Sequence, residues 1–279
     1  MKIVYFGTDV FLKVFQYLLS QHEILALYTY HNNEDYFTER EIVRLAHMIG
    51  IPVHYDRITE EQIRAYVLDA GCGLFFSAEY DGKIPVPADI PLFRAVNIHS
   101  ALLPEGRSYY PIETAMAAQR SVSGVTIHKL AAAFDRGDIL AQHSFPIEPQ
   151  DDSVDIYLKS AAAACGLTKE IMSDLEGYWS QARVQTLPLP SWKLSPQAER
   201  TITHQMTVAQ ARELYRRFNK LTIVCVDAMA FYVDGFMPGN AMIGNSDRDI
   251  IPISDRRIIY GLADGNVRID IEPMQSSRQ

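Results

Sequence analysis

The first third of the chain alternates short apolar runs with amphipathic segments, and this rhythm constrains the fold more than any other feature. Runs rich in β-branched and aromatic residues fall at residues 2–6, 24–30, 51–53 and 73–77. Between them, apolar positions recur at helical spacing after residue 10 and over residues 39–49 and 60–68. Strands that alternate with helices in this way predict a parallel sheet covered by helices on both faces. We therefore expect an α/β, Rossmann-like domain.

The remainder of the chain extends this domain and then changes character. Further strands are predicted at residues 95–98, 123–130 and 139–145, and a helix at 154–175. The prolines of TLPLPSWKL, residues 186–194, indicate a linker. Beyond it we expect a helix at 207–218, then strands at 221–226, 230–233, 257–262 and 267–271, with hairpin turns at Asp234-Gly235 and Asp264-Gly265. The predicted division is a large domain over 1–185, a linker over 186–204 and a small β-rich domain over 205–279.

Charge and composition narrow the classes of function. The formal net charge is −8 and the pI is about 5.5, which disfavours a nucleic-acid partner because a polyanion needs a basic face. Three widely spaced cysteines give neither a disulfide framework nor a metal site, and the histidines show no metal-ligand spacing. No apolar run is long enough to span a membrane, and MKIVYFGTDVF lacks the features of a signal peptide. These features favour a cytoplasmic protein.

The first strand-to-helix turn, Gly7-Thr8-Asp9, lies where parallel sheets bind ligands, at the carboxyl end of a strand. It does not match the G-x-G-x-x-G pattern of dinucleotide-binding proteins, and no acidic residue follows the second strand in the position that pattern requires. The sequence therefore argues against a nicotinamide cofactor, and a tight turn explains Gly7.

Asn97 and His99 are two positions apart in a predicted strand, so their side chains should lie on the same face. An amide can donate a hydrogen bond to a developing oxyanion, and an imidazole can exchange a proton with an amine. This pair suits acyl-group chemistry. Taken alone, the same two residues could equally satisfy buried backbone groups at a strand end.

A second segment supplies a carboxylate. The predicted strand over residues 123–130 leads into a loop that ends in Asp135-Arg-Gly137-Asp138. Gly137 permits a sharp turn, and the loop could present Asp135 at the carboxyl edge of the sheet. A carboxylate beside His99 would fix its tautomer and raise its pKa. His128, within the strand, is interpreted as a residue of the core or rim.

Together, NIHSALLPEGRSYYPIETAM and SGVTIHKLAAAFDRGDIL resemble the 10-formyltetrahydrofolate-dependent formyltransferases. The resemblance is good to about residue 175 and weaker to the end. It implies that Asn97, His99 and Asp135 are catalytic and that the co-substrate is 10-formyltetrahydrofolate. It also implies that a substrate amine attacks the formyl carbon while Asn97 and protonated His99 bind the oxyanion and Asp135 orients His99.

The resemblance further implies where the two substrates lie. The pterin of the donor would lie between residues 76–83 and the loop 131–135, and the residues assigned to it are Phe76, Ala78, Tyr80, Lys83, Ala133 and Asp138. Five residues are assigned to the acceptor: Gly7, Thr8, Arg107, Tyr109 and Tyr110. Arg107 could equally stabilise its own loop, and Tyr109 and Tyr110 could merely cover the following helix.

Departures from the family pattern bear on the acceptor. Ala101 and Ser108 replace the usual serine and glycine, and residues 31–39 hold acidic residues where the tRNA enzyme has a basic cluster. We expect a small amine, with an amino sugar on a nucleotide carrier as the first candidate. Methionyl-tRNA and a hydroxyornithine-type amine are the alternatives, and a catalytically inactive folate or nucleotide binder is a further one. Related sugar enzymes suggest a homodimer.

Overall fold

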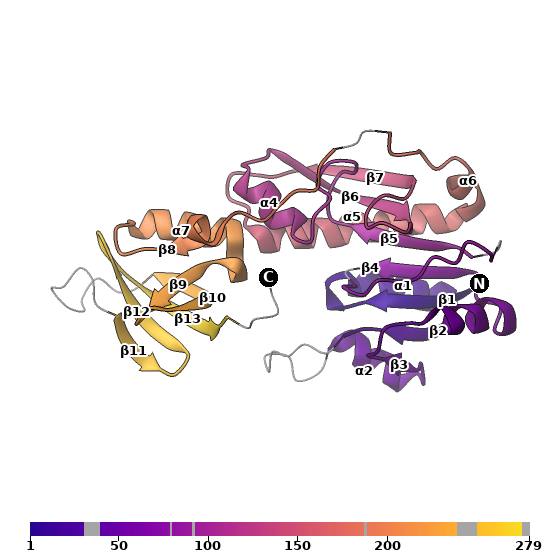
Figure 1. The fold of residues 1–279 in the computed structure, drawn as a ribbon, viewed down its shortest axis with the longest axis horizontal. Coiled ribbons are helices and arrows are strands. Elements are labelled where there is room, and N and C mark those ends of the chain that lie inside the picture. The colour runs from indigo at the N-terminus through magenta and orange to yellow at the C-terminus, as the bar shows by residue number, and fades with distance from the viewer. Residues whose placement is uncertain (31–39, 79, 91–92, 187–188, 239–249, 275–279) are drawn as a thin grey trace. The chain divides into compact units, whose positions relative to one another are not determined.

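The computed structural model describes residues 1–30, 40–78, 80–90, 93–186, 189–238 and 250–274 (Figure 1). The chain forms two compact units. The first contains residues 1–109, 122–146 and 157–192, and the second contains residues 110–121, 147–156 and 193–279. Two short segments, 110–121 and 147–156, therefore belong to the second unit although the chain on both sides of each belongs to the first. The segment 31–39, which bears on the acceptor in the sequence argument, lies outside the described residues.

The first unit is built on a seven-stranded sheet with the order β3-β2-β1-β4-β5-β6-β7, which can be followed in Figure 1. Its strands are β1 (Lys2–Gly7), β2 (Glu23–Tyr28), β3 (Val53–His54), β4 (Leu74–Ala78), β5 (Ala95–His99), β6 (Val122–Lys129) and β7 (Ile139–Pro146). The first five are parallel, whereas β6 is antiparallel to both β5 and β7. The expected parallel sheet is confirmed for β1–β5, and β6 adds an antiparallel strand to it. The short β6–β7 loop has no room for a crossover helix, so these two strands also pair antiparallel.

Helices complete this unit and begin the second. They are η1 (Asp9–Phe11), α1 (Leu12–Gln21), α2 (Glu41–Met48), α3 (Glu60–Arg64), α4 (Pro111–Ala117), α5 (Ser153–Ser173) and α6 (Leu175–Ser180). A capping box between Thr59 and Gln62 starts α3, which continues as a π-helical stretch, η2 (Ala65–Asp69). Asp9 accepts hydrogen bonds from the backbone N–H groups of Glu41 and Ile42, at 3.0 and 2.9 Å, and so caps α2. Among the described helices, none is long and apolar enough to cross a membrane.

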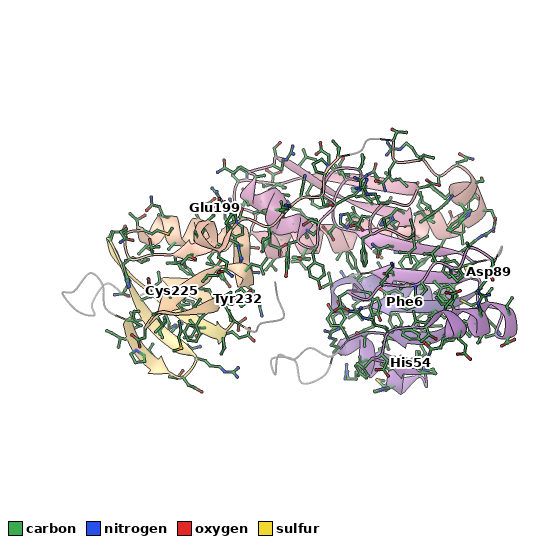
Figure 2. All side chains as sticks on the ribbon, in the orientation of Figure 1. Phe6, His54, Asp89, Glu199, Cys225 and Tyr232 are labelled. Carbon is green, nitrogen blue, oxygen red and sulfur yellow. The ribbon has the colours of Figure 1, made fainter. Side chains whose placement is uncertain are left out.

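The sheet separates two apolar clusters, because successive side chains of a strand point to opposite faces. Tyr5 and Phe76 belong to the cluster that includes α1, α2 and α5. Phe6, labelled in Figure 2, and Phe75 belong to the cluster on the other face with α3. The ring of Phe6 stacks on that of Tyr28, with centroids 5.0 Å apart. On β5, Val96 and Ile98 pack in the first cluster. The residues between and after them, Asn97 and His99, therefore face the second side.

The second unit contains a six-stranded sheet with the order β11-β12-β13-β10-β9-β8. Its elements are η3 (Gln197–Arg200), β8 (Thr201–Ile202), α7 (Val208–Phe218), η4 (Asn219–Leu221), β9 (Ile223–Val226), β10 (Met229–Pro238), β11 (Ile250–Ser254), β12 (Arg257–Leu262) and β13 (Gly265–Pro273). The β12–β13 hairpin turns at Ala263 and Asp264, one residue before the predicted Asp264-Gly265, and Gly265 is the first residue of β13. Asp234-Gly235 is not a turn, because it lies at a register shift within β10. The β9–β10 turn instead uses Asp227 and Ala228, which both have positive φ.

A buried hydroxyl offers a test of the core. Tyr5 is 0% exposed, and its hydroxyl has no hydrogen-bond partner among the described residues. Its ring packs between Phe15 and Phe76, at 5.0 and 5.9 Å. Tyr5→Phe removes an unsatisfied buried polar atom and keeps the ring, so we expect the free energy of unfolding to rise by about 1 kcal/mol in urea titrations.

Tyr28→Phe is the matched control. The Tyr28 hydroxyl lies 3.5 Å from that of Tyr66, so its removal breaks a contact instead of relieving a penalty. We expect no stabilisation there. A destabilised Tyr5→Phe variant would contradict the assignment of an unsatisfied hydroxyl.

Candidate active site

The pairing of β5 with β6 brings the polar residues together. In the antiparallel register Asn97 is opposite His128 and His99 is opposite Thr126. Because residues opposite each other in a ladder share a face, all four side chains project from the same side of the sheet. Their neighbours Val125 and Ile127 are buried in the core on the other side. The polar cluster is thus fixed by strand register.

Asp135 is held by its backbone as well as by its side chain. Its φ of 54° is left-handed, which is uncommon for a residue other than glycine. Its carbonyl accepts hydrogen bonds from Arg107 Nε at 3.2 Å and from Gln185 Nε2 at 2.9 Å. Gln185 Nε2 also donates to the carbonyl of Gly137, where an added Cβ would lie 1.8 Å from the Lys129 carbonyl oxygen. The loop therefore requires a glycine at this position and two side-chain clamps.

His99 is buried and fixed from both sides. Its Nε2 lies 2.8 Å from the carbonyl oxygen of Gly106, which can only accept, so Nε2 carries a hydrogen. In the neutral ring, Nδ1 is then unprotonated. Nδ1 faces Asp135 Oδ1 at 3.6 Å. A proton placed between these two atoms would therefore be stabilised by both.

His128 is a member of this cluster that the sequence argument missed. It is 1% exposed. Its Nδ1 lies 2.8 Å from the Lys129 carbonyl oxygen, and its Nε2 lies 3.4 Å from Asn97 Nδ2 and 3.6 Å from Asp135 Oδ1. Its position in the predicted strand could have indicated this, because His128 faces the side of the sheet opposite to Val125 and Ile127. Among the described residues, no group of His, Cys, Asp or Glu is arranged to hold a metal ion.

Burial and charge set the protonation of the cluster. Burial lowers the pKa of His99, and Asp135 and the Gly106 carbonyl offset this only in part. The expected rise in the pKa of His99 was therefore wrong, because desolvation outweighs the carboxylate. Burial alone would raise the pKa of Asp135, but interactions with His128, His99 and Arg107 outweigh it and leave that pKa below its ordinary value. At neutral pH the free protein therefore holds an ionised Asp135 beside a neutral His99.

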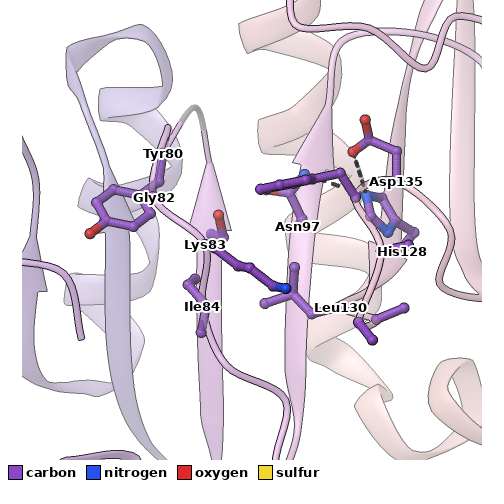
Figure 3. Close-up of a pocket in the computed structure, with 13 residues that line it drawn as sticks. Tyr80, Gly82, Lys83, Ile84, Asn97, His128, Leu130 and Asp135 are labelled. Carbon is purple, nitrogen blue, oxygen red and sulfur yellow. Dashed lines mark hydrogen bonds and ion pairs between the residues drawn. The ribbon is translucent and has the colours of Figure 1, made fainter. Parts of the chain in front are cut away.

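A cavity opens beside this cluster. Figure 3 shows Asn97, His128 and Asp135 on one side of it, with Tyr80, Gly82, Lys83 and Ile84 across from them. The remaining lining consists of Ser77 and the loop residues Leu130, Ala131, Ala132, Ala133 and Phe134. His99 does not line the cavity and lies behind Asp135, with its Nδ1 3.6 Å from Oδ1. The lining combines apolar side chains with polar ones, and Tyr80 and Lys83 lie across from the cluster of Asn97, His128 and Asp135.

The residues assigned to the donor divide into two sets. Tyr80, Lys83 and Ala133 line the cavity. Phe76 and Ala78 do not, because their strand parity places them in the core on the opposite face. Ser77, between them, lines the cavity and pairs with Asn97 across β4 and β5. Two-residue periodicity along β4 would have selected Ser77 in their place.

Asp138, also assigned to the donor, lies outside the lining. Its carboxylate is 3.4 Å from Lys129 Nζ, and its carbonyl accepts the Lys129 N–H at 2.8 Å. The residue thus closes the β6–β7 loop onto the end of β6. Its position supports a turn-forming role and not a contact with the donor.

The residues assigned to the acceptor are placed as follows. Arg107 is 2% exposed and donates to Asp135, to Gln185 and to the Leu189 carbonyl, so its guanidinium supports the Asp135 loop. An added Cβ at Gly7 would lie 2.4 Å from the Ala78 carbonyl oxygen, which explains the glycine by close strand packing.

The other three acceptor residues are less constrained. Thr8 is 6% exposed and makes no side-chain capping bond at η1. Tyr109 is 72% exposed in the first unit, whereas Tyr110 precedes α4 in the second unit. Their roles in binding the acceptor stay predictions.

Comparison with known proteins identifies the family to which the chain belongs. A model of the formyl transferase family matches residues 58–168, which include Asn97, His99 and Asp135. Methionyl-tRNA formyltransferase of Acinetobacter baumannii is 31% identical over 238 residues, covering 78% of this chain and 74% of that protein. The chain belongs to the formyl transferase family. It is a folate-dependent formyltransferase that takes its one-carbon unit from 10-formyltetrahydrofolate.

Solved structures share the fold of this formyltransferase. An N-formyltransferase from Helicobacter canadensis, in complex with folinic acid and dTDP-3-aminofucose, has a TM-score of 0.61 at 20% identity, over 97% of this chain and 98% of that one. HypX from Aquifex aeolicus, in complex with tetrahydrofolic acid, has a TM-score of 0.67 at 16% identity. That match covers 96% of this chain but 43% of HypX, so the formyltransferase spans less than half of that longer protein.

Burial of His99 makes stability depend on pH. An unfolded imidazole has a pKa of about 6.5, and the pKa of folded His99 lies lower. Between these values the unfolded chain binds more protons than the folded chain, so acidification through this window lowers the free energy of unfolding. We expect His99→Gln to flatten this part of the curve of unfolding free energy against pH, measured by urea titration.

The control is His143→Gln, because His143 is exposed on β7. That variant should keep the pH dependence of the unmodified protein. An unchanged slope in His99→Gln would show that His99 is not held neutral by burial.

Proposed function

We propose that this formyltransferase transfers the formyl group to a primary amine of a small substrate, with an amino sugar on a nucleotide carrier as the preferred acceptor. The observation that carries the reaction is the meeting of Asn97, His128 and Asp135 at one end of the cavity, with His99 behind Asp135. The choice of a small acceptor rests on the charge of the chain.

The cavity suits a folate donor. Tyr80, Ile84 and Leu130 supply apolar surface, and the loop residues Ala131–Ala133 present backbone and methyl groups. A flat, partly apolar pterin with a polar edge fits walls of this chemistry. Tyr80, Lys83 and the loop would hold the donor, which supplies an electrophilic formyl carbon and a nitrogen that takes up a proton on release.

The chain's own residues would act on the substrates as donors and acceptors of hydrogen bonds and protons. Asn97 Nδ2 carries two hydrogens, and one is directed at His128. The other is available to the formyl oxygen, where charge develops. Ionised Asp135 accepts the proton that the attacking amine loses, and His99 Nδ1, 3.6 Å from Oδ1, shares it. The neutral state of His99 fits a receiver of the proton.

Charge favours a small acceptor over tRNA. In the second unit, four of the described basic side chains pair with acidic ones: Arg216 and Arg217 with Glu213, Lys220 with Asp234 and Arg257 with Asp270. The pairing with Arg216 and Arg217 lowers the pKa of Glu213 to about 2. Cations neutralised in this way contribute little to binding a phosphate backbone. The net charge of −8 points in the same direction.

Methionyl-tRNA is the second candidate acceptor. The relative from Acinetobacter baumannii, at 31% identity, bears that name. The preferred acceptor is supported by the N-formyltransferase from Helicobacter canadensis, whose structure contains dTDP-3-aminofucose and matches almost the full length of both chains. The two candidates differ in charge, since one is a polyanion and the other a compact diphosphate.

Substitution tests the catalytic assignment. Asn97→Ala, His99→Ala and Asp135→Ala should each lower kcat, with the loss of the Asn97 donor costing roughly a hundred- to a thousandfold. Each variant should keep a cooperative thermal transition close to that of the unmodified protein. Initial rates of tetrahydrofolate release measure the effect. Near-normal turnover by His99→Ala or Asp135→Ala would remove that residue from the reaction.

The acceptor is tested by competition. The protein is incubated with 10-formyltetrahydrofolate and either a panel of nucleotide-linked amino sugars or methionyl-tRNA, and products are analysed by mass spectrometry. We expect a formylated amino sugar and no formylmethionyl-tRNA, at rates that depend weakly on salt. Formylation of the tRNA alone, with strong salt dependence, would contradict the proposed acceptor and leave the family assignment intact.

A further inference from the structure

His128 occupies a place in the site that the three catalytic residues leave unexplained. It is 1% exposed, yet it lines the cavity between Asn97 and Asp135. His99, by contrast, does not line the cavity. The imidazole that faces the cavity is therefore His128. The dashed contacts in Figure 3 join this cluster from β5, β6 and the loop that follows β6.

The backbone fixes the tautomer of His128. The Lys129 carbonyl oxygen, 2.8 Å from Nδ1, can only accept a hydrogen bond, so Nδ1 carries the hydrogen. In the neutral ring, Nε2 then has a lone pair and must accept. Asn97 Nδ2, at 3.4 Å, is the donor that faces it. Because Nδ1 carries the hydrogen, Nε2 can pair only with a hydrogen-bond donor.

This selection orients the Asn97 amide. If the amide were rotated by half a turn, its carbonyl oxygen would face the Nε2 lone pair, and two acceptors would oppose each other. The observed orientation leaves the second N–H of Nδ2 for the cavity. We infer that His128 is a positioning residue, which fixes the Asn97 amide so that its free N–H meets the formyl oxygen. This inference rests on the proposed reaction.

Protonation would reverse the effect. A hydrogen on Nε2 would make it a donor, and Asp135 Oδ1, 3.6 Å away, would become its partner in place of Asn97. The hydrogen bond through which His128 lowers the pKa of Asp135 belongs to this protonated form. Other charged or titratable groups near this position, among the described residues, include His99 on β5, with its ring 6.5 Å from that of His128, and Arg107 behind Asp135. Tyr80 and Lys83 line the same cavity. Neutral His128 is therefore the form that holds Asn97.

Two variants separate positioning from packing. His128→Leu fills the space but cannot accept a hydrogen bond, and we expect kcat to fall roughly ten- to a hundredfold because the donor is no longer aimed. His128→Gln can present a carbonyl oxygen to Asn97 and should recover most of the loss, with KM for the folate donor little changed in both. His143→Leu, on the exposed side of β7, is the control and should keep full activity.

A double-mutant cycle tests the route through Asn97. If His128 acts through that amide, Asn97→Ala combined with His128→Leu should be little slower than Asn97→Ala alone. Losses that multiply fully would overturn the inference. Equal loss in His128→Gln and His128→Leu, in variants with unchanged thermal transitions, would also overturn it.

A measurement without substrate distinguishes failure of the inference from failure of the proposed function. Long-range ¹H–¹⁵N spectra of ¹⁵N-histidine-labelled protein report the tautomer of each ring. We expect His128 as the Nδ1–H form and His99 as the Nε2–H form at neutral pH. An Nε2–H tautomer at His128 would overturn the inference even in an active enzyme. If the tautomers are as expected but the protein formylates no amine, the proposed function is contradicted and the inference about His128 is not.

Discussion

The antiparallel pairing of β5 with β6 is the constraint on which the site depends. It sets Asn97 opposite His128 and His99 opposite Thr126, while the alternate residues of both strands enter the apolar core. A slip of one residue would send the polar groups into the core and the apolar groups to the cavity. The hydrophobic effect that holds Val96, Ile98, Val125 and Ile127 in place therefore also aligns the chemistry. The strand register that stabilises the core therefore also positions the residues of the site.

Much of this arrangement was accessible from the sequence. Two-residue periodicity placed Asn97 and His99 on one face, and the glycine in Asp135-Arg-Gly137 marked the turn that presents the carboxylate. The same periodicity, applied to the strand over 123–130 and to residues 73–77, would have identified His128 and Ser77. Those residues were missed because a histidine or a serine among apolar neighbours is usually a satisfied core residue. Only strand pairing shows what lies opposite it.

Other features could not be derived from local patterns. β6 is antiparallel to β5 although residues 100–121 and α4 join them, so the direction of that strand could not be derived from loop length. The register shift at Asp234-Gly235 imitates a hairpin signal. The pKa of His99 depends on the balance between burial and one carboxylate, and a sequence contains no measure of burial. The clamps on Asp135 come from Arg107 and Gln185, which are 28 and 50 residues away along the chain. Contacts at such separations follow from the fold as a whole.

The Gln185 clamp also bears on where the first unit ends. The described residues between α6 and Trp192 form no helix or strand longer than one bridge, yet they supply Gln185 and the Leu189 carbonyl that accepts from Arg107. The Trp192 N–H donates to the Arg107 carbonyl at 2.6 Å. A fragment cut after the last helix of this unit would keep the sheet but lose the brace on the carboxylate loop. For protein engineering, any exchange of the C-terminal unit with a relative should place its junction beyond Trp192.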